Sequence, residues 1–185
     1  MKISIVKWSD FKTSTWSGGT TSEIIIVPKG AEVGKRNFDL RISTATCDLD
    51  ESVFSDYTGF KRYIAPVDGE LVLDVEGSEV KLSPYEVYGF NGSEAVTGYS
   101  KVRDYNLIFK EGLNAQMESF VLRDVKVLTL TSKNYLIQSF DSDIRFETEN
   151  ESGVLNKNDA LLIENANGFL KLYSEVETPL FLIQY

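Results

Sequence analysis

Apolar residues in this chain fall in short runs bounded by Gly, Pro, Asn and Asp, and this pattern most limits what the chain can fold into. Many runs alternate apolar and polar residues, which is the period of a half-buried β-strand. The clearest runs cover residues 22–28, 38–45, 69–75, 105–110, 125–131, 134–140 and 179–185. No amphipathic segment of ten or more residues favours a helix. We therefore expect an all-β architecture, for which a sandwich or barrel is the usual solution.

Turn residues between these runs support the same architecture. Asp68-Gly69 and Glu76-Gly77 are typical hairpin turns, and together they predict a β-meander that ends at Leu82. The polar stretch 147–152 is short enough to be a hairpin loop rather than a domain boundary. A chain of 185 residues without a Pro/Ser-rich linker is expected to form one domain or two tightly fused halves.

A weak internal repeat appears when the sequence is shifted by 73 positions. The segment 82–90 then falls on 155–163, and 107–109 falls on 180–182. Each half has a turn with an acidic residue, an apolar strand, a polar hairpin and a final apolar strand. This agrees with a duplicated barrel module, and equally with the generic rhythm of two β-meanders.

Missing residue types exclude several classes of function. The chain has no histidine, which excludes Ser-His triads and every metal site built on imidazole. Its one cysteine, Cys47, therefore lacks a histidine base and is expected to be a packing residue. A net charge of −9 disfavours nucleic acid and anionic membranes as partners. The beginning of the chain lacks the apolar stretch of a signal peptide, so we expect a cytoplasmic protein.

Specific residues between positions 8 and 112 match a known family in order, spacing and type. They are Trp16-Ser-Gly-Gly19-Thr20-Thr-Ser-Glu23, Pro28, Phe38, Leu40-Arg41-Ile-Ser43, Phe54-Ser, Gly59, Arg62, Gly69-Glu70, Leu82, Phe90-Asn-Gly92 and Asp104-Tyr-Asn106. In these positions the chain resembles the HutD/Ves family. After about residue 115 the likeness extends only to the rhythm of the strands.

This resemblance implies a cupin-like β-barrel, a jelly roll of the RmlC type, in a bicupin arrangement. We expect residues 1–115 to form an N-terminal cupin-like module, and residues 116–185 a smaller module packed on it as one unit. HutD-like members suggest a non-catalytic regulator of histidine utilisation that binds a small anionic metabolite such as N-formylglutamate, whereas Ves-like members suggest a stress response. The likeness also suggests a homodimer. Because the chain has no histidine, we expect neither a cofactor nor a metal.

Strand parity identifies candidate ligand-binding residues within the matching positions. Side chains two residues apart share a face, so Arg41 points with Ser43, and Asp104 with Asn106. A guanidinium pairs bidentately with carboxylates, so arginines suit an anionic ligand. The full candidate set is Trp16, Gly19, Thr20, Glu23, Arg41, Ser43, Arg62, Asp104 and Asn106.

Each candidate also has a purely structural interpretation. The two arginines are equally suited to internal salt bridges with Glu23 or Asp104, since buried charges are usually paired. The glycines suit a tight turn, and Asp104 and Asn106 suit a strand end. An alternative function is a cupin enzyme of isomerase, lyase or oxygenase type, with a metal held by Glu23, Asp104 and Asn106.

Overall fold

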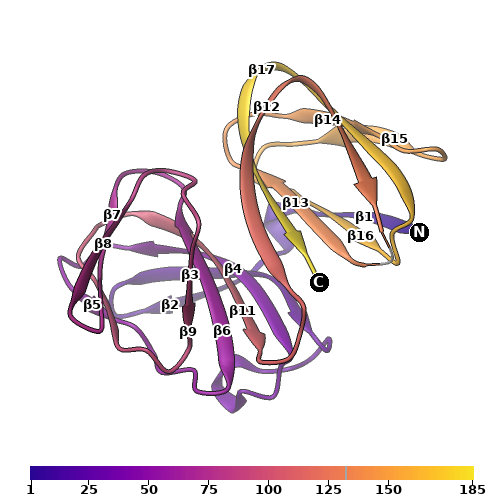
Figure 1. Cartoon of the computed structure of the whole chain (residues 1–185). Coiled ribbons are helices and arrows are strands. Elements are labelled where there is room, and N and C mark those ends of the chain that lie inside the picture. Colours follow the sequence, from indigo (N-terminus) through magenta and orange to yellow (C-terminus); the bar gives the residue numbers. More distant parts are fainter. Residues whose placement is uncertain (132) are drawn as a thin grey trace. The chain divides into compact units, whose positions relative to one another are not determined.

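The computed structural model describes residues 1–131 and 133–185, and it confirms the expected all-β architecture (Figure 1). Helical structure in the described residues is limited to two single turns, η1 (Trp8–Asp10) and η2 (Val33–Lys35). None of the helices described is long and apolar enough to cross a lipid bilayer. The chain divides into an N-terminal unit, Phe11–Leu113, and a C-terminal unit, which combines Met1–Asp10 with Asn114–Tyr185.

The N-terminal unit consists of two antiparallel sheets. The larger sheet has the strand order β2 (Lys12–Trp16), β3 (Gly19–Val27), β4 (Leu40–Cys47), β11 (Arg103–Lys110), β6 (Phe60–Pro66) and β9 (Tyr88–Asn91). The smaller sheet has the order β5 (Ser52–Val53), β10 (Val96–Gly98), β7 (Leu71–Val75) and β8 (Ser78–Leu82). Buried residues of both sheets, among them Ile64, Leu73 and Phe90, form one apolar cluster, so the sheets pack face to face.

The predicted β-meander is only half right. Val75 pairs with Ser78 across Glu76-Gly77, whose φ angles of 51° and 82° are those of a type I′ hairpin turn, as the sequence indicates. Residues Asp68-Gly69, in contrast, connect β6 to β7, which lie in different sheets. Asp68-Gly69 is therefore part of a connection between the two sheets and not a hairpin turn.

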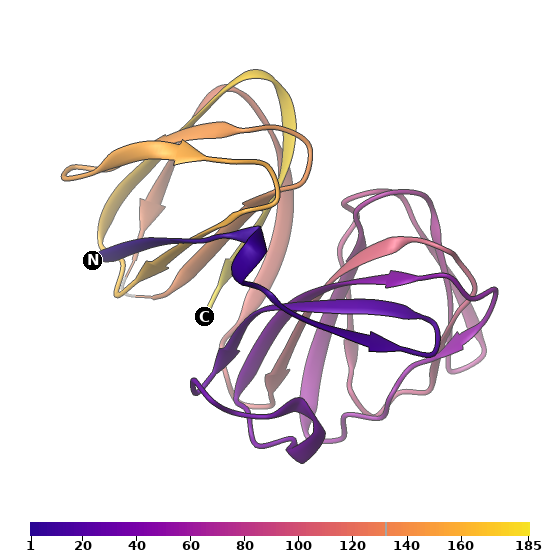
Figure 2. The same ribbon diagram turned by 180° about the vertical axis from the view of Figure 1, so that it is seen from behind.

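The C-terminal unit is built on one antiparallel sheet, seen from both sides in Figures 1 and 2. Its strand order is β1 (Lys2–Val6), β16 (Ala160–Glu164), β13 (Tyr135–Ser139), β17 (Gly168–Gln184), β14 (Ile144–Glu147) and β15 (Ser152–Leu155), and β12 (Gln116–Leu130) also pairs with β17. The long strands β12 and β17 pair with each other on both sides of an irregularity, which lies between Leu122 and Asp124 on β12 and between Ser174 and Thr178 on β17. Before it β17 also pairs with β14, and after it with β13.

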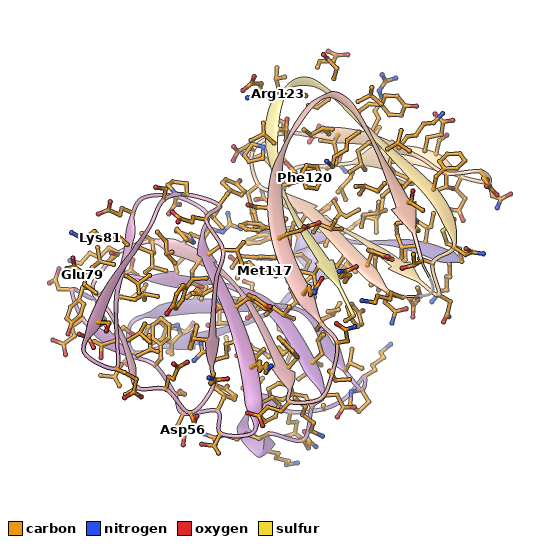
Figure 3. The ribbon with its side chains drawn as sticks, viewed as in Figure 1. Asp56, Glu79, Lys81, Met117, Phe120 and Arg123 are labelled. Carbon is orange, nitrogen blue, oxygen red and sulfur yellow. The ribbon has the colours of Figure 1, made fainter. Side chains whose placement is uncertain are left out.

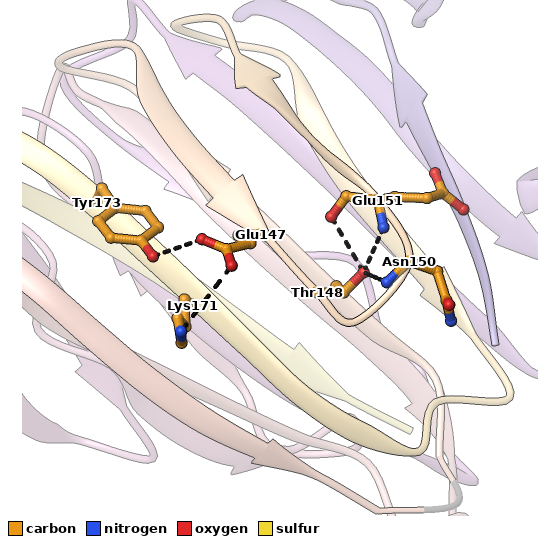
Figure 4. Close-up of polar contacts among 6 residues, drawn as sticks. All are labelled: Glu147, Thr148, Asn150, Glu151, Lys171 and Tyr173. Carbon is orange, nitrogen blue, oxygen red and sulfur yellow. Dashed lines mark hydrogen bonds and ion pairs between the residues drawn. The ribbon is translucent and has the colours of Figure 1, made fainter.

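The stretch predicted as a hairpin loop is one. Glu147 pairs with Ser152, and the turn between them is closed by Thr148, whose hydroxyl oxygen lies 3.1 Å from both the backbone nitrogen and the backbone carbonyl oxygen of Glu151 (Figure 4). At its base, the Tyr173 hydroxyl donates a hydrogen bond to Glu147 at 2.7 Å. A hydroxyl that satisfies the backbone of its own turn is a typical role for threonine.

The two units differ from the expected division into residues 1–115 and 116–185, because the beginning of the chain belongs to the C-terminal unit. Strand β1 pairs with β16 over its full length, from Lys2 opposite Glu164 to Val6 opposite Ala160. The first ten residues therefore belong to the C-terminal unit, and the N-terminal unit ends at Leu113. A sheet-edge pairing across more than 150 residues leaves no local signal in the sequence.

Strand pairing gives the internal repeat a structural counterpart. Pairs in β6–β9 and in β7–β8 reappear 73 residues later in β13–β16 and β14–β15, with unchanged register. Examples are Arg62–Phe90 with Tyr135–Ile163, and Leu71–Leu82 with Ile144–Leu155. The final strand differs: Tyr63 pairs with Leu107, whereas its counterpart Leu136 pairs with Ile183, 76 residues further on. The predicted match of 107–109 to 180–182 is thus wrong by three positions.

Candidate functional site

A cavity of about 650 Å³ lies within the N-terminal unit, and strand parity decides which side chains reach it. On β4 the side chains of Arg41 and Ser43 line the cavity, while Ile42 between them is fully buried. On β11 Asp104 and Asn106 line it, while Tyr105 between them is fully buried. The neighbouring strands thus turn one polar face toward a common hollow.

Arg41 is neutralised inside this cavity by Glu23. The Arg41 Nε atom lies 2.9 Å from Glu23 Oε2, and the two side chains are only 12% and 14% exposed. Glu23 lies on β3 beside an irregularity, where Ser43 pairs with Glu23 and Ile42 pairs with Ile25, so one extra residue is accommodated. Such bulges commonly redirect a side chain next to a site. The internal salt bridge considered from the sequence is therefore present for Arg41.

Arg62 is held very differently. Its residue is 8% exposed, it forms no ion pair in the described part of the chain, and its Nε atom has no hydrogen-bond partner there. One Nη1 contact, to the Ser55 carbonyl, is long at 3.4 Å. The guanidinium carbon lies 4.9, 5.1 and 5.5 Å from the ring centres of Phe90, Phe54 and Tyr57, which we call the aromatic cage.

Burial lowers the pKa of Arg62 to about 10, while electrostatic interactions with Tyr57 and Asp104 act in the opposite direction. The guanidinium still carries its full charge near neutral pH. Cation–π contacts with the aromatic cage compensate part of the lost hydration. They supply no hydrogen-bond acceptor, however, and a buried charge normally has one. The site therefore contains a desolvated cation with an unused N–H donor at Nε.

Asp104 and Asn106 form a second polar group in the same cavity. The Asn106 side-chain amide donates a hydrogen bond to Asp104 Oδ1, and the Asp104 backbone carbonyl accepts one from the Thr44 hydroxyl at 2.7 Å. Burial raises the pKa of Asp104 to about 7, against the opposing effects of the Asn106 hydrogen bond and the Arg62 charge. A carboxyl group of this kind can be either ionised or protonated near neutral pH.

The remaining candidates divide into two groups. Trp16, at the end of β2, lines the cavity and is 37% exposed. Gly19 and Thr20 lie outside its lining. The Thr20 backbone N–H instead donates to the Thr46 hydroxyl at 3.1 Å, and a Cβ atom on Gly19 would lie 2.0 Å from the Thr46 carbonyl oxygen. A purely structural role thus accounts for Gly19, because β3 and β4 approach too closely there for any side chain.

The sequence pattern did not indicate that Phe54, Tyr57 and Phe90 surround Arg62. Phe54 and Tyr57 belong to the loop before β6, where no periodicity indicates the direction of a side chain. Backbone bonds fix this loop: the Phe54 N–H donates to Val96 at 2.9 Å, and the Tyr57 N–H donates to Gly92 at 2.7 Å. A Cβ on Gly92 would come within 2.1 Å of the Tyr57 carbonyl oxygen, which explains the glycine. The motif 90–92 therefore positions the cage.

The alternative metal site finds little support in the geometry. In the described residues no group of three or more Cys, Asp or Glu side chains is arranged to hold an ion. Of the residues proposed as ligands, Glu23 is engaged by Arg41, and Asp104 by Asn106. A metal would have to displace both partners.

The C-terminal unit provides an internal control for the cavity. Following the strand pairings from one unit to the other gives cavity residues on the strands a counterpart, and five of these counterparts are large and apolar. The matches are Arg62 with Tyr135, Ala45 with Phe120, Gly98 with Leu172, Asp104 with Leu180 and Asn106 with Leu182.

All five counterparts belong to the apolar interior of the C-terminal unit. Tyr135, Leu172, Leu180 and Leu182 are buried members of its core cluster, and Phe120 packs against that cluster from β12 (Figure 3). At these five positions, small or polar residues of the N-terminal unit correspond to large residues of the apolar interior in the other unit. Arg41 and Ser43 correspond instead to the exposed polar residues Gln116 and Glu118.

Comparisons with known proteins agree with this architecture. Among curated proteins there is no match. A conserved protein of unknown function from Pseudomonas aeruginosa PAO1 superposes with a TM-score of 0.89 at 22% identity, over 100% of this chain and 98% of that one. HutD from Pseudomonas fluorescens SBW25, solved in a formate condition, gives 0.78 at 24% identity, over 100% of both chains.

A cupin 2 conserved barrel domain protein from Leptotrichia buccalis gives a TM-score of 0.59 at 13% identity, over 99% of this chain and 97% of that one. These similarities show a cupin-like β-barrel fold. The HutD family model itself matches residues 8–180, and because it covers nearly the whole sequence, the chain belongs to the HutD family.

Proposed function

We propose that this protein is a non-catalytic binding protein for a small carboxylate-bearing metabolite, of which N-formylglutamate is the first candidate. The observation that carries the proposal is Arg62, a buried guanidinium with an unused N–H donor and no counter-ion in the described residues. A carboxylate satisfies such a group bidentately. The proposal needs one arginine as the anchor instead of two, since Arg41 is already paired with Glu23.

The internal control strengthens this proposal. A barrel of this type holds a stable apolar interior when large residues fill it, as the C-terminal unit does. A cavity lined by polar groups makes the folded state less stable, because packing contacts are lost and charged groups are only partly hydrated. Retaining Arg62, Asp104 and Asn106 at such positions is expected where they bind something.

We further propose that the two units are related cupin modules, in a bicupin, of which only the N-terminal one keeps a ligand site. The repeated strand pairs support a common origin. Family membership supports a regulatory role in histidine utilisation, exerted in the cytoplasm. The acidic composition favours action through a protein partner or through ligand sequestration over direct DNA binding. A homodimer remains part of the proposal, to be tested by light scattering.

Isothermal titration with N-formylglutamate, formate, glutamate and a neutral sugar tests the function. We expect binding of at least one carboxylate and none of the sugar. The Arg62→Met variant keeps an apolar stem inside the aromatic cage and removes the donors, so affinity should fall by about 100-fold, the equivalent of about 2.7 kcal/mol. Arg123→Met is the matched control, because Arg123 is 69% exposed, belongs to the C-terminal unit and is not among the residues that line the cavity.

Two results would overturn the proposal. The first is that none of the carboxylates binds to the folded wild-type protein. The second is that Arg62→Met and Arg123→Met bind the same carboxylate with equal affinity, which would place recognition elsewhere.

A further inference from the structure

A second hollow, of about 660 Å³, lies on the C-terminal unit. Strand pairing places Val125, Tyr173, Arg145 and Val154 in one row across β12, β17, β14 and β15, and Val176 lines the same hollow. The three valines are 52%, 48% and 57% exposed, so the hollow is an open groove on the surface of the sheet. We call it the valine groove.

The walls of the valine groove are held in place by hydrogen bonds. The Val176 carbonyl oxygen accepts hydrogen bonds from the buried hydroxyls of Ser174 and Thr178, at 2.7 and 3.0 Å. The Tyr173 hydroxyl is fixed by its bond to Glu147 at the side of the row (Figure 4). A binding partner therefore has few side chains to order in this groove, which lowers the entropic cost of association.

The N-terminal unit shows what the matching positions carry in the other copy of the repeat. The matches given by strand pairing are Val154 with Lys81, Val125 with Glu51, and Val127 with the exposed Val53. At two of these three surface positions, a charged residue of the N-terminal unit thus corresponds to an exposed valine of the C-terminal unit. Apolar side chains that gather on the surface of a soluble protein mark a contact surface.

The charges of the valine groove indicate which kind of partner fits it. Asp124, Asp143 and Glu175 line it together with Arg145, and all four side chains are exposed. None of the four forms an ion pair with another described residue, although Asp143 accepts the backbone N–H of Lys157 at 2.7 Å. Three carboxylates and one guanidinium leave the lining with a net charge of −2. A partner with positive charge is therefore attracted.

The three carboxylates lie at one end of the groove. Asp143 comes two residues before Arg145, and Glu175 comes two residues after Tyr173 on the antiparallel neighbour, so both lie on the same side of the row. Asp124 lies on that side too, directly before the first valine of the row. The row itself crosses three gaps between strands, or about 14 Å, which is the length of about four residues of extended chain.

We propose that the valine groove binds an extended segment of a partner protein, with apolar side chains along the segment and a lysine or arginine at one end. The apolar side chains cover Val125, Val154 and Val176, the basic side chain meets the three carboxylates, and Arg145 donates to a backbone carbonyl of the segment. A second copy of this chain fits less well, because each copy carries a net charge of −9 and the same acidic end. The inference does not depend on the ligand site of the N-terminal unit.

Selecting a phage-displayed library of random linear peptides on the immobilised full chain tests the groove and the chemistry of its partner together. We expect the enriched peptides to combine alternating apolar residues with at least one lysine or arginine. Isothermal titration with the most enriched peptide then gives its affinity for the wild-type protein. This affinity should fall as salt is raised from about 0.05 to about 0.5 M, because exposed charge pairs are screened.

Variants of exposed residues locate the binding surface. The double variant Val125→Glu and Val154→Lys introduces the residues of the other unit without changing the net charge of the groove, and it should bind the selected peptide at least about tenfold more weakly. Glu175→Lys keeps the valines and should weaken binding through charge alone. Val121→Gln is the matched control, because Val121 is 48% exposed on β12 but does not line the groove, so affinity should stay unchanged. Circular dichroism checks that each variant is folded.

Four results would overturn the inference. The first is that no peptide is enriched over the bare support, and the second is that the enriched peptides are acidic or purely apolar. The third is equal affinity of the selected peptide for the wild-type protein and the double variant. The fourth is a wild-type dimer, seen by light scattering, that the double variant converts to a monomer, since a second copy would then occupy the groove. None of these results bears on carboxylate binding in the N-terminal unit, which is measured separately.

Discussion

Replacing Arg62 by methionine should stabilise the protein in the absence of ligand. The native side chain is a buried cation with no counter-ion in the described residues, and the substitution exchanges it for an apolar chain of similar length within the aromatic cage. Arg62 would then favour ligand binding at the expense of the stability of the folded protein. Such a trade-off is common where a site is kept strained or desolvated for function.

The magnitude follows from the environment of the guanidinium. Burial lowers the pKa of Arg62 from 12.5 to about 10, a displacement that corresponds to about 3 kcal/mol against the charged form. Because the folded-state pKa is the lower one, this cost is fully present at every pH below about 10. Cation–π contacts with three rings offset about 1 to 2 kcal/mol. Methionine sulfur adds about 0.3 to 1.5 kcal/mol per ring contact.

The net expectation is a gain of about 1 to 3 kcal/mol, or a rise in Tm of about 2 to 12 °C for a chain of this length. Urea and thermal unfolding near neutral pH, followed by circular dichroism, measure it. Arg123→Met should stay within about 0.5 kcal/mol of wild type, because its exposed ion pair with Glu177 contributes little. A loss of more than about 1 kcal/mol in Arg62→Met would refute the reasoning, since the guanidinium would then be well compensated.

Further predictions concern the groups around this cation and the opposite unit. Burial raises the pKa of Asp104 from 3.8 to about 7, so the folded protein holds a proton that the unfolded chain releases. The free energy of unfolding should therefore fall by on the order of 2 to 4 kcal/mol as pH rises from about 4 to about 7. Urea titrations of Asp104→Asn should lack this pH dependence, and an unchanged dependence contradicts the assignment. A double-mutant cycle of Glu23→Gln and Arg41→Met should give a coupling of about 1 to 3 kcal/mol in unfolding experiments, and a value near zero would mean that solvent screens the pair. Leu180→Ala should cost about 2 to 5 kcal/mol in the same assay without changing ligand affinity, and a loss of affinity at equal folding would contradict the separation of roles.

Periodicity was sufficient to predict the parts of the site that lie on strands. The alternation in β4 and β11 predicts that Arg41 and Ser43, or Asp104 and Asn106, share a face, and both pairs line the cavity. Local turn chemistry likewise identifies the Glu76-Gly77 hairpin. These features depend only on residues close in sequence, where the period of a strand and the φ preferences of glycine act directly.

Other parts of the site depend on contacts between distant segments. The two arginines look alike in the sequence, yet Glu23 reaches Arg41 because of an irregularity in β3, while Arg62 is surrounded by rings from a loop and from β9. No rule of spacing distinguishes a paired arginine from an unpaired one. The partner of β1 and the three-residue displacement of the last strand are likewise set by sheet pairing, which the local sequence does not encode.

A crystal structure of the protein grown with N-formylglutamate tests the central claim most directly. The account predicts a ligand carboxylate within hydrogen-bond distance of the Arg62 guanidinium, with the pair of Arg41 and Glu23 still closed. A ligand carboxylate bound to Arg41 after that pair has opened, with Arg62 left untouched in its aromatic cage, would contradict it.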